Sequence, residues 1–166
     1  FNKTLSEATA KQYDRSPVQT ITLGKGVNMG SDPEVFAFDE DGMVIPAWMF
    51  LPPKGRDSVF WDGVQGEFTV LPNTCHAYLV DNIRNGLRNV HAEMKLKYPR
   101  AKLDYKCVVD VPQAMLDAAS DDHAGLGCAP SFNAYPDIAP LNIADPRALP
   151  IRFAGCHIHF GYGKVG

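Results

Sequence analysis

The hydrophobic positions of this chain follow two spacings, one typical of helices and one typical of strands. The helical spacing joins apolar residues three or four positions apart, namely Leu79, Ile83, Leu87, Val90 and Met94. They share one face of an α-helix, which we expect to begin with Asn73 or Thr74 as its N-cap. Pro99 halts this helix at about Lys97. Gly86 lies inside it at a cost of roughly 1 kcal/mol relative to Ala, which predicts a close packing contact there.

Short β-rich runs bounded by turn residues lie on both sides of this helix. Residues 35–38 (VFAF) and 43–47 predict a β-hairpin, because the DEDG sequence between them is typical of a tight turn. Other segments are expected as single strands over 66–71, 103–111 and 151–162 and as a short helix over 112–119.

The composition is that of a globular domain. The chain has 166 residues, of which 45% are hydrophobic and 21% charged, with a formal net charge of −3. No apolar run approaches the roughly 18 residues that a membrane span requires, and no basic stripe favours nucleic acid as a partner. The 14 Gly and 13 Pro residues favour short strands joined by turns over a helical bundle.

The two ends of the chain differ from its centre. Residues 1–26 are polar and aperiodic and predict an N-terminal arm, in which 18–23 is a candidate edge strand. Residues 27–166 are expected to form one domain. Because the chain begins with Phe1 and stops at Gly166, soon after its most chemical motif, we expect a piece of a larger protein. Four scattered cysteines without a CxxC pair favour reduced thiols in the cytoplasm.

Acidic residues occur at positions that favour a metal. Asp32 and Glu34 are two residues apart, so an extended chain presents both carboxylates on one face of a sheet. Burying both charges together is costly unless a divalent cation neutralises them. Glu67 lies inside an otherwise apolar strand, where a lone charge is rare unless it is paired or bound to metal. The alternatives are an Asp-Pro turn with a solvated Glu34 and an outward-facing Glu67. Asp62, which precedes Gly63, is interpreted as a turn residue and not as a ligand.

The strongest chemical signal is the GCHIHFG sequence over residues 155–161. His157 and His159 occupy alternate positions of a predicted strand, so both imidazoles face the same side, as in many two-histidine metal sites. This pattern favours contact with a metal or a phosphate, and the alternative is a pair of structural or exposed histidines. Cys156 faces the other side by alternation and is expected to be a small core residue.

Two basic residues are candidates for contact with phosphate. Lys54 and Arg56 lie in a Pro- and Gly-containing loop that is able to neutralise phosphate, with an ordinary solvated loop as the alternative. The chain contains no P-loop motif and no GxGxxG motif, which excludes the two commonest phosphate-binding loops.

Three sequence blocks occur in a recognisable order: GSDPEVFAFDEDG at 30–42, DGVQGEF at 62–68 and AGCHIHFG at 154–161. Together they resemble the carboxylate–amine ligase superfamily of glutamine synthetase and glutamate–cysteine ligase. Within that superfamily the chain is most similar to the phage-encoded carboxyl–amine ligase type 2 branch.

The resemblance implies an α+β fold, with an antiparallel β-sheet, helices packed on one face, and a concave face that binds ATP and Mg²⁺. The implied metal ligands are Asp32, Glu34, Glu67 and His157, and the candidates for binding ATP are His159, Lys54 and Arg56. Asp32 stands where better-known members have glutamate. Relatives carry arginines and further acids after the histidine block, so the domain 27–166 is expected to be incomplete at its C-terminus.

The resemblance implies a ligase in which a substrate carboxylate attacks the ATP γ-phosphate and an amine captures the acyl phosphate. Its expected partners are small-molecule or peptide carboxylates and amines, and also further copies of the chain or phage particle proteins. Its expected location is the host cytoplasm or the virion. Two alternatives stay open: a phage virion or assembly protein that keeps the fold without turnover, and a mononuclear metalloenzyme that uses His157, His159 and one carboxylate.

Overall fold

A computed structural model describes residues 27–55, 58–126 and 145–162 of the chain. The expected N-terminal arm, with its candidate strand at 18–23, lies outside the described residues. Within the described ranges, no helix is long and apolar enough to cross a membrane.

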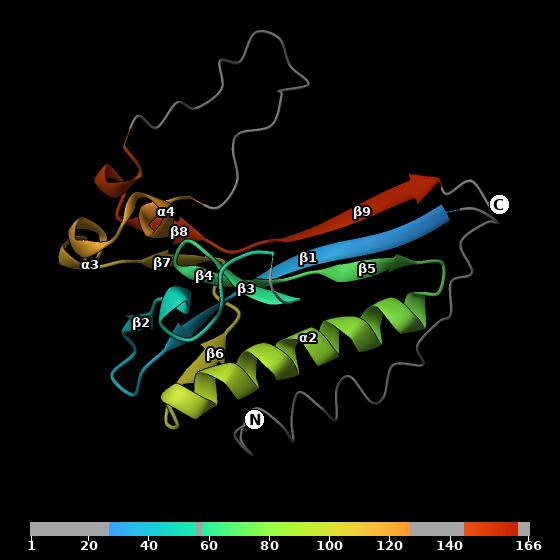
Figure 1. Cartoon of the computed structure of the whole chain (residues 1–166), viewed down its shortest axis with the longest axis horizontal. Coiled ribbons are helices and arrows are strands. Elements are labelled where there is room, and N and C mark those ends of the chain that lie inside the picture. Colours follow the sequence, from blue (N-terminus) through green and yellow to red (C-terminus); the bar gives the residue numbers. More distant parts are fainter. Residues whose placement is uncertain (1–26, 56–57, 127–144, 163–166) are drawn as a thin grey trace, which may run out of the picture.

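The central element is the long strand β1 (Val27–Phe38), which belongs to a seven-stranded sheet (Figure 1). Five other strands pair with it, all antiparallel: β2 (Val44–Ile45), β4 (Gln65–Phe68), β5 (Val70–Asn73), β6 (Lys102–Asp104) and β9 (Cys156–Tyr162). The seventh strand, β3 (Val59–Asp62), pairs antiparallel with β4. The expected hairpin is confirmed as β1 and β2. The fold is mixed α and β with a mostly antiparallel sheet, as the sequence predicted at this level.

The long helix α2 (His76–Lys97) covers one face of the sheet and runs beneath the strands in Figure 1. Its buried residues are Leu79, Val90 and Met94. The predicted apolar face and the predicted C-terminal end are therefore confirmed. The predicted N-cap is wrong, because Cys75 occupies that position. Asn73 instead accepts a hydrogen bond from the Cys75 N–H at 2.8 Å, which forms a turn just before the helix.

Gly86 is the point of closest approach between α2 and the sheet. A Cβ added to Gly86 would lie 2.1 Å from Cδ2 of Phe68, a fully buried residue of β4. No side chain fits at that distance, so the glycine allows the helix to lie directly against the aromatic ring. The close packing contact that the sequence predicted at Gly86 is confirmed.

The opposite face of the sheet carries a second hydrophobic cluster. Phe36 and Phe38 of β1 alternate with residues that pack against α2, so they point away from that helix. The elements that cover them are β7 (Val108–Asp110) and the short helix α3 (Gln113–Ala118), together with Ala154, which directly follows β8 (Ile151–Phe153). Strands β7 and β8 form a separate two-stranded sheet. The expectation that helices pack on only one face is wrong for α3, because its buried Leu116 belongs to this second cluster.

Three of the expected strands are each divided in two. The segment 66–71 is split at Thr69 between β4 and β5, the segment 103–111 contains β6 and β7, and the segment 151–162 contains β8 and β9. In the last two cases the halves belong to different sheets, since β6 and β9 pair with β1 whereas β7 pairs with β8. Strand β3 was not expected. Local alternation shows only that a segment is extended, and the partner of each strand decides where it breaks.

The remaining short elements are η1 (Ala47–Met49), α4 (Asp121–Ala124) and η2 (Pro146–Ala148). Arg152 of β8 joins two of them, because its buried guanidinium donates to the carbonyls of Ala124 and Pro146 at 2.7 and 3.2 Å. A buried guanidinium needs such acceptors, because an unpaired buried charge is strongly destabilising. Arg152 therefore fixes α4 and η2 against the second cluster.

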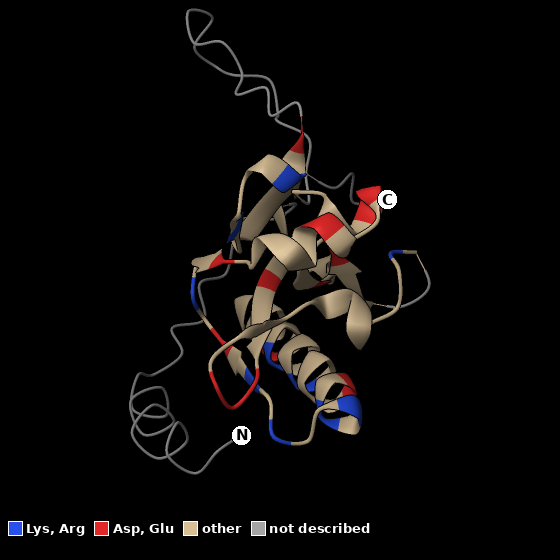
Figure 2. Ribbon diagram, turned by 90° about the vertical axis from the view of Figure 1, so that its left-hand side faces the viewer, with Lys and Arg blue, Asp and Glu red and all other residues tan. Residues whose placement is uncertain are grey.

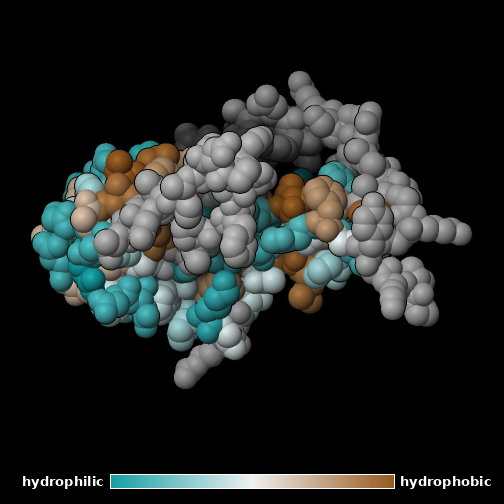
Figure 3. Space-filling view, turned by 90° about the horizontal axis from the view of Figure 1, so that it is seen from above, coloured by the Kyte–Doolittle hydropathy of each residue, from teal (hydrophilic) through white to brown (hydrophobic). Residues whose placement is uncertain are grey.

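Apolar side chains are also exposed in separate patches on the surface that is seen from above (Figure 3). The exposed large hydrophobic residues include Val108 and Phe153, which are direct partners in the β7–β8 ladder, and Ile158 and Phe160 of β9. The last two alternate along β9 with its histidines. Strand β9 thus has an apolar face and a polar face.

We expect Gly86→Ala to destabilise the protein, because the added methyl group would overlap the Phe68 ring. The free energy of unfolding, measured with urea, should fall by about 1–3 kcal/mol. Asn89→Ala on the exposed side of α2 is the matched control, and it should leave stability equal or slightly higher. Equal stability of Gly86→Ala and wild type would contradict the packing contact.

Candidate functional site

The register of the central strands brings the predicted polar residues to one face of the sheet. Glu34 of β1 is directly opposite Glu67 of β4, and Asp32 of β1 is directly opposite His157 of β9. Residues directly opposite each other in an antiparallel ladder point to the same face. This face lies away from α2, because Glu34 alternates with the β1 residues that pack against that helix.

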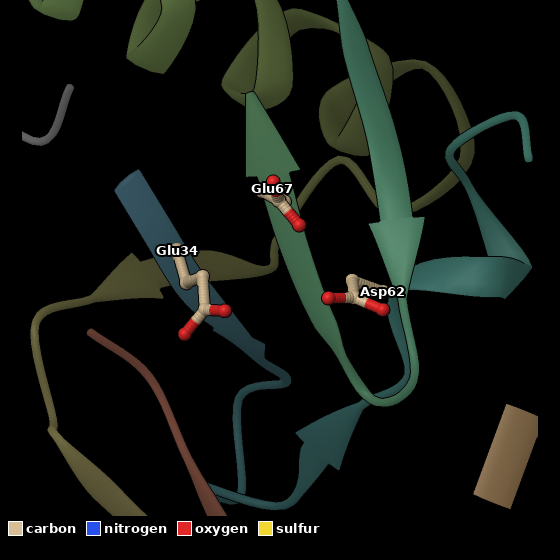
Figure 4. Close-up of side chains that lie close together, drawn as sticks. All are labelled: Glu34, Asp62 and Glu67. Atoms are coloured by element: carbon tan, nitrogen blue, oxygen red, sulfur yellow. The ribbon is translucent and has the colours of Figure 1, made fainter. Parts of the chain in front are cut away.

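Three carboxylates form an acidic cluster on this face: Glu34 of β1, Asp62 of β3 and Glu67 of β4. One oxygen of each lies within 4.8 Å of the others, and the three side chains converge in Figure 4. Glu34 and Glu67 were predicted as metal ligands, whereas the sequence favoured a turn role for Asp62. Asp62 does precede the β3–β4 turn, but it is also the third carboxylate of the cluster. The signal that could have identified it is its place in the second resemblance block, five residues before Glu67.

The position of Asp62 depends on the tight turn that follows β3. Gly63 has a φ of +60°, a conformation that favours glycine, and a Cβ added there would lie 2.6 Å from the Gly125 carbonyl oxygen. That carbonyl comes directly after α4, whose last residue accepts a hydrogen bond from the buried Arg152. The turn is thus packed tightly against a segment that Arg152 holds in place.

Glu34 is held by neutral donors. Its Oε2 accepts a hydrogen bond from the Gly155 N–H at 2.7 Å, and its own N–H donates to the Gly155 carbonyl at 2.9 Å. The side-chain amide of Gln65 is also hydrogen-bonded to this carboxylate. Burial raises the pKa of Glu34, the Gly155 N–H opposes that rise, and the nearby Asp62 adds to it. Glu34 therefore has a fixed orientation without a full counter-charge.

Glu67 is the most strongly perturbed member of the acidic cluster. Burial, a hydrogen bond with Asp62 and the charges of Asp62 and Glu34 raise its pKa from 4.5 to about 7. Lys54 opposes this, with its Nζ 3.7 Å from Oε1 of Glu67 and 4.9 Å from the centre of the Phe60 ring. The Lys54 side chain is 67% exposed, so solvent screens much of its charge.

The acidic cluster has the chemistry of a site for a hard divalent cation. Carboxylate oxygens are the preferred ligands of Mg²⁺, Ca²⁺ and Mn²⁺. Several of the basic residues lie along α2, which covers the other face of the sheet (Figure 2). Those of α2 are Arg84, Arg88, Lys95 and Lys97. They are thus separated from the acidic cluster by the sheet, and a cation would supply the neutralisation that Lys54 gives only in part.

The two histidines of β9 lie beside the acidic cluster. The ring centroids of His157 and His159 are 6.2 Å apart, on the same face of the strand as predicted. Nε2 of His159 lies 2.7 Å from Oδ2 of Asp32, so this carboxylate pairs with a histidine instead of joining the acidic cluster. His157 is close enough to Glu34 to lower its pKa. The sheet face therefore carries a row of carboxylates and imidazoles across several strands.

The sequence also predicted that Cys156 is a core residue and that Arg56 is a candidate for phosphate contact. Cys156 is exposed and not a core residue, and its Sγ lies 3.2 Å from Oγ of Ser31, which also donates to the His157 carbonyl at 2.8 Å. The prediction failed because nothing packs over this part of β9 among the described residues. Arg56, a predicted phosphate contact, lies outside the described residues.

Comparison with known proteins adds no assignment. No protein-family model, curated protein or solved structure matches this chain. The function must therefore be argued from the residues of this site.

The raised pKa of Glu67 predicts a pH-dependent stability. The folded state holds this proton more tightly than the unfolded state, so the stabilisation is complete below pH 4.5 and is lost as the pH rises through about 7. In chelator-treated buffer, wild type should lose on the order of 2–3 kcal/mol between pH 4.5 and 8 relative to Glu67→Gln, whose amide mimics the protonated acid. Urea unfolding at a series of pH values measures this difference.

Glu40→Gln is the matched control, because Glu40 is an exposed partner of Arg100 at 2.8 Å outside the acidic cluster. Its pH profile should follow that of wild type. Parallel profiles for wild type and Glu67→Gln would show that the folded protein does not favour the protonated form of Glu67.

Proposed function

We propose that this chain belongs to an ATP- and Mg²⁺-dependent ligase that joins a carboxylate to an amine. The observation that carries the proposal is the acidic cluster, in which carboxylates from three strands lie within 4.8 Å of one another. The order of the three sequence blocks supports the same conclusion. The proposal includes a sheet of the glutamine-synthetase type, for which the mostly antiparallel arrangement around β1 is the supporting feature.

The residues of the face fit a magnesium site. The donors are oxygen atoms of Glu34, Asp62 and Glu67. The buried Gln65 lies beside them, and its amide oxygen has no hydrogen-bond partner among the described residues. When bound, Mg²⁺ offsets the repulsion between a substrate carboxylate and the triphosphate of ATP. Compared with the predicted ligand set, Asp62 takes the place of Asp32, which pairs with His159.

The remaining polar residues of the face suit the binding of phosphate. His157 and His159 are exposed, next to the acidic cluster, and able to donate hydrogen bonds to phosphate oxygens. Lys54, which pairs with Glu67, supplies an exposed positive charge. In the proposed reaction a carboxylate oxygen bonds to the γ-phosphorus and ADP leaves. The amine nitrogen then bonds to the acyl carbon, and inorganic phosphate and a proton leave.

Calorimetric titration of ATP into the purified protein with Mg²⁺ tests the proposal. Wild type should bind ATP in a Mg²⁺-dependent manner, and Glu34→Gln/Glu67→Gln should lose at least about tenfold in affinity, because both substitutions remove a ligand charge. Glu40→Gln is the control and should bind as wild type does. Folded wild-type protein that binds no ATP with Mg²⁺ would refute the proposal and favour an assembly protein that keeps the fold without turnover.

The pairing of His159 with Asp32 at 2.7 Å favours one second candidate, a mononuclear metalloenzyme built on the two histidines. Metal analysis separates it from the ligase. We expect no stoichiometric zinc or iron in protein purified without chelator, because the acidic cluster is an oxygen site for weakly held Mg²⁺. One equivalent of zinc or iron that is lost in His157→Ala would instead assign the site to the histidines.

A further inference from the structure

Gln65 is a buried polar residue that the sequence did not single out. It lies on β4 two residues before Glu67 and directly opposite Asp62, so its side chain shares the face of the acidic cluster. It is only 1% exposed. A residue buried to this degree beside three carboxylates has to satisfy both ends of its amide within the site.

Only one end of the amide is satisfied among the described residues. The side chain is hydrogen-bonded to Glu34, and because a carboxylate is an acceptor, the amide nitrogen is the donor. Oε1 of Gln65 then has no hydrogen-bond partner in the described part of the chain. A buried acceptor without a donor is destabilising, so its retention indicates a donor that the described residues do not supply.

The acidic cluster indicates what that donor is. A divalent cation among the three carboxylates keeps part of its hydration shell, and Mg²⁺ keeps several of its water molecules. The hydrogens of a cation-bound water point outward, so such a water is a strong donor to a nearby amide oxygen. The same cation would satisfy the charge of Glu34, Asp62 and Glu67 and the free acceptor of Gln65.

We propose that Gln65 is a positioning residue of the cation site, which holds Glu34 through its amide nitrogen and accepts a hydrogen bond from a cation-bound water through Oε1. This inference rests on the cation site of the proposed function and assigns a role to a residue outside the predicted ligand set. An apolar residue at this position would leave Glu34 without one of its donors. A glutamate would add a fourth carboxylate, whose charge a bound cation would stabilise.

Two substitutions test the role, with Mg²⁺ alone as the probe and no ATP. Gln65→Met removes both hydrogen-bonding ends at similar volume, and it should weaken Mg²⁺ binding by about tenfold in calorimetry. Gln65→Glu keeps an acceptor and adds a charge. It should lower the Tm of the chelator-treated protein and give a larger Mg²⁺-dependent rise in Tm than wild type. Gln113→Met, at an exposed glutamine on α3, is the control and should show the wild-type rise.

The outcomes separate this inference from the proposed ligase activity. Mg²⁺ affinities equal to wild type in both Gln65 variants would overturn the role of Gln65 alone. If Gln65→Met does not fold, a Mg²⁺-dependent rise in Tm for Gln65→Glu no larger than that of wild type overturns it as well. Absence of Mg²⁺ binding by folded wild-type protein would remove the cation site and this role together. Mg²⁺ binding without ATP binding would count against the ligase and leave the role of Gln65 supported.

Discussion

Antiparallel pairing along β1 is the constraint on which the rest of the structure depends. Five strands, one a hairpin neighbour and four from more distant parts of the sequence, pair with this one strand, and each ladder has a defined register. A shift of one residue in any ladder would turn every side chain of that strand to the other face. The register therefore decides at once which residues form the core against α2 and which polar groups meet on the opposite face.

The face of β1 that points away from α2 changes character along its length. Phe36 and Phe38 are covered by β7 and α3, whereas Asp32 and Glu34 belong to the polar part of the same face. Apolar residues at one end supply burial energy without requiring partners. The acids at the other end lose hydration and need donors or a counter-charge. The sheet thus combines a half that stabilises the fold with a half whose electrostatic cost a bound cation would offset.

The balance of effects at Glu67 shows how large that cost is. Loss of hydration and neighbouring carboxylates raise its pKa to about 7, and Lys54 offsets this only in part from an exposed position 3.7 Å away. Glu34, by contrast, is oriented by two neutral donors, the Gly155 N–H and the Gln65 side-chain amide. Orientation by neutral groups leaves the negative charge of Glu34 available to a ligand.

The sequence by itself determined the features that depend on local spacing. Apolar residues at intervals of three and four defined α2, Gly86 indicated its contact with the sheet, and acids two residues apart had to share a face of one strand. Only the tertiary structure decided that Asp62 and Gln65 join Glu34 and Glu67, and that three expected strands are each divided. The reason is physical: proximity between strands comes from their hydrogen-bonded register, and no local periodicity specifies the partner of a strand.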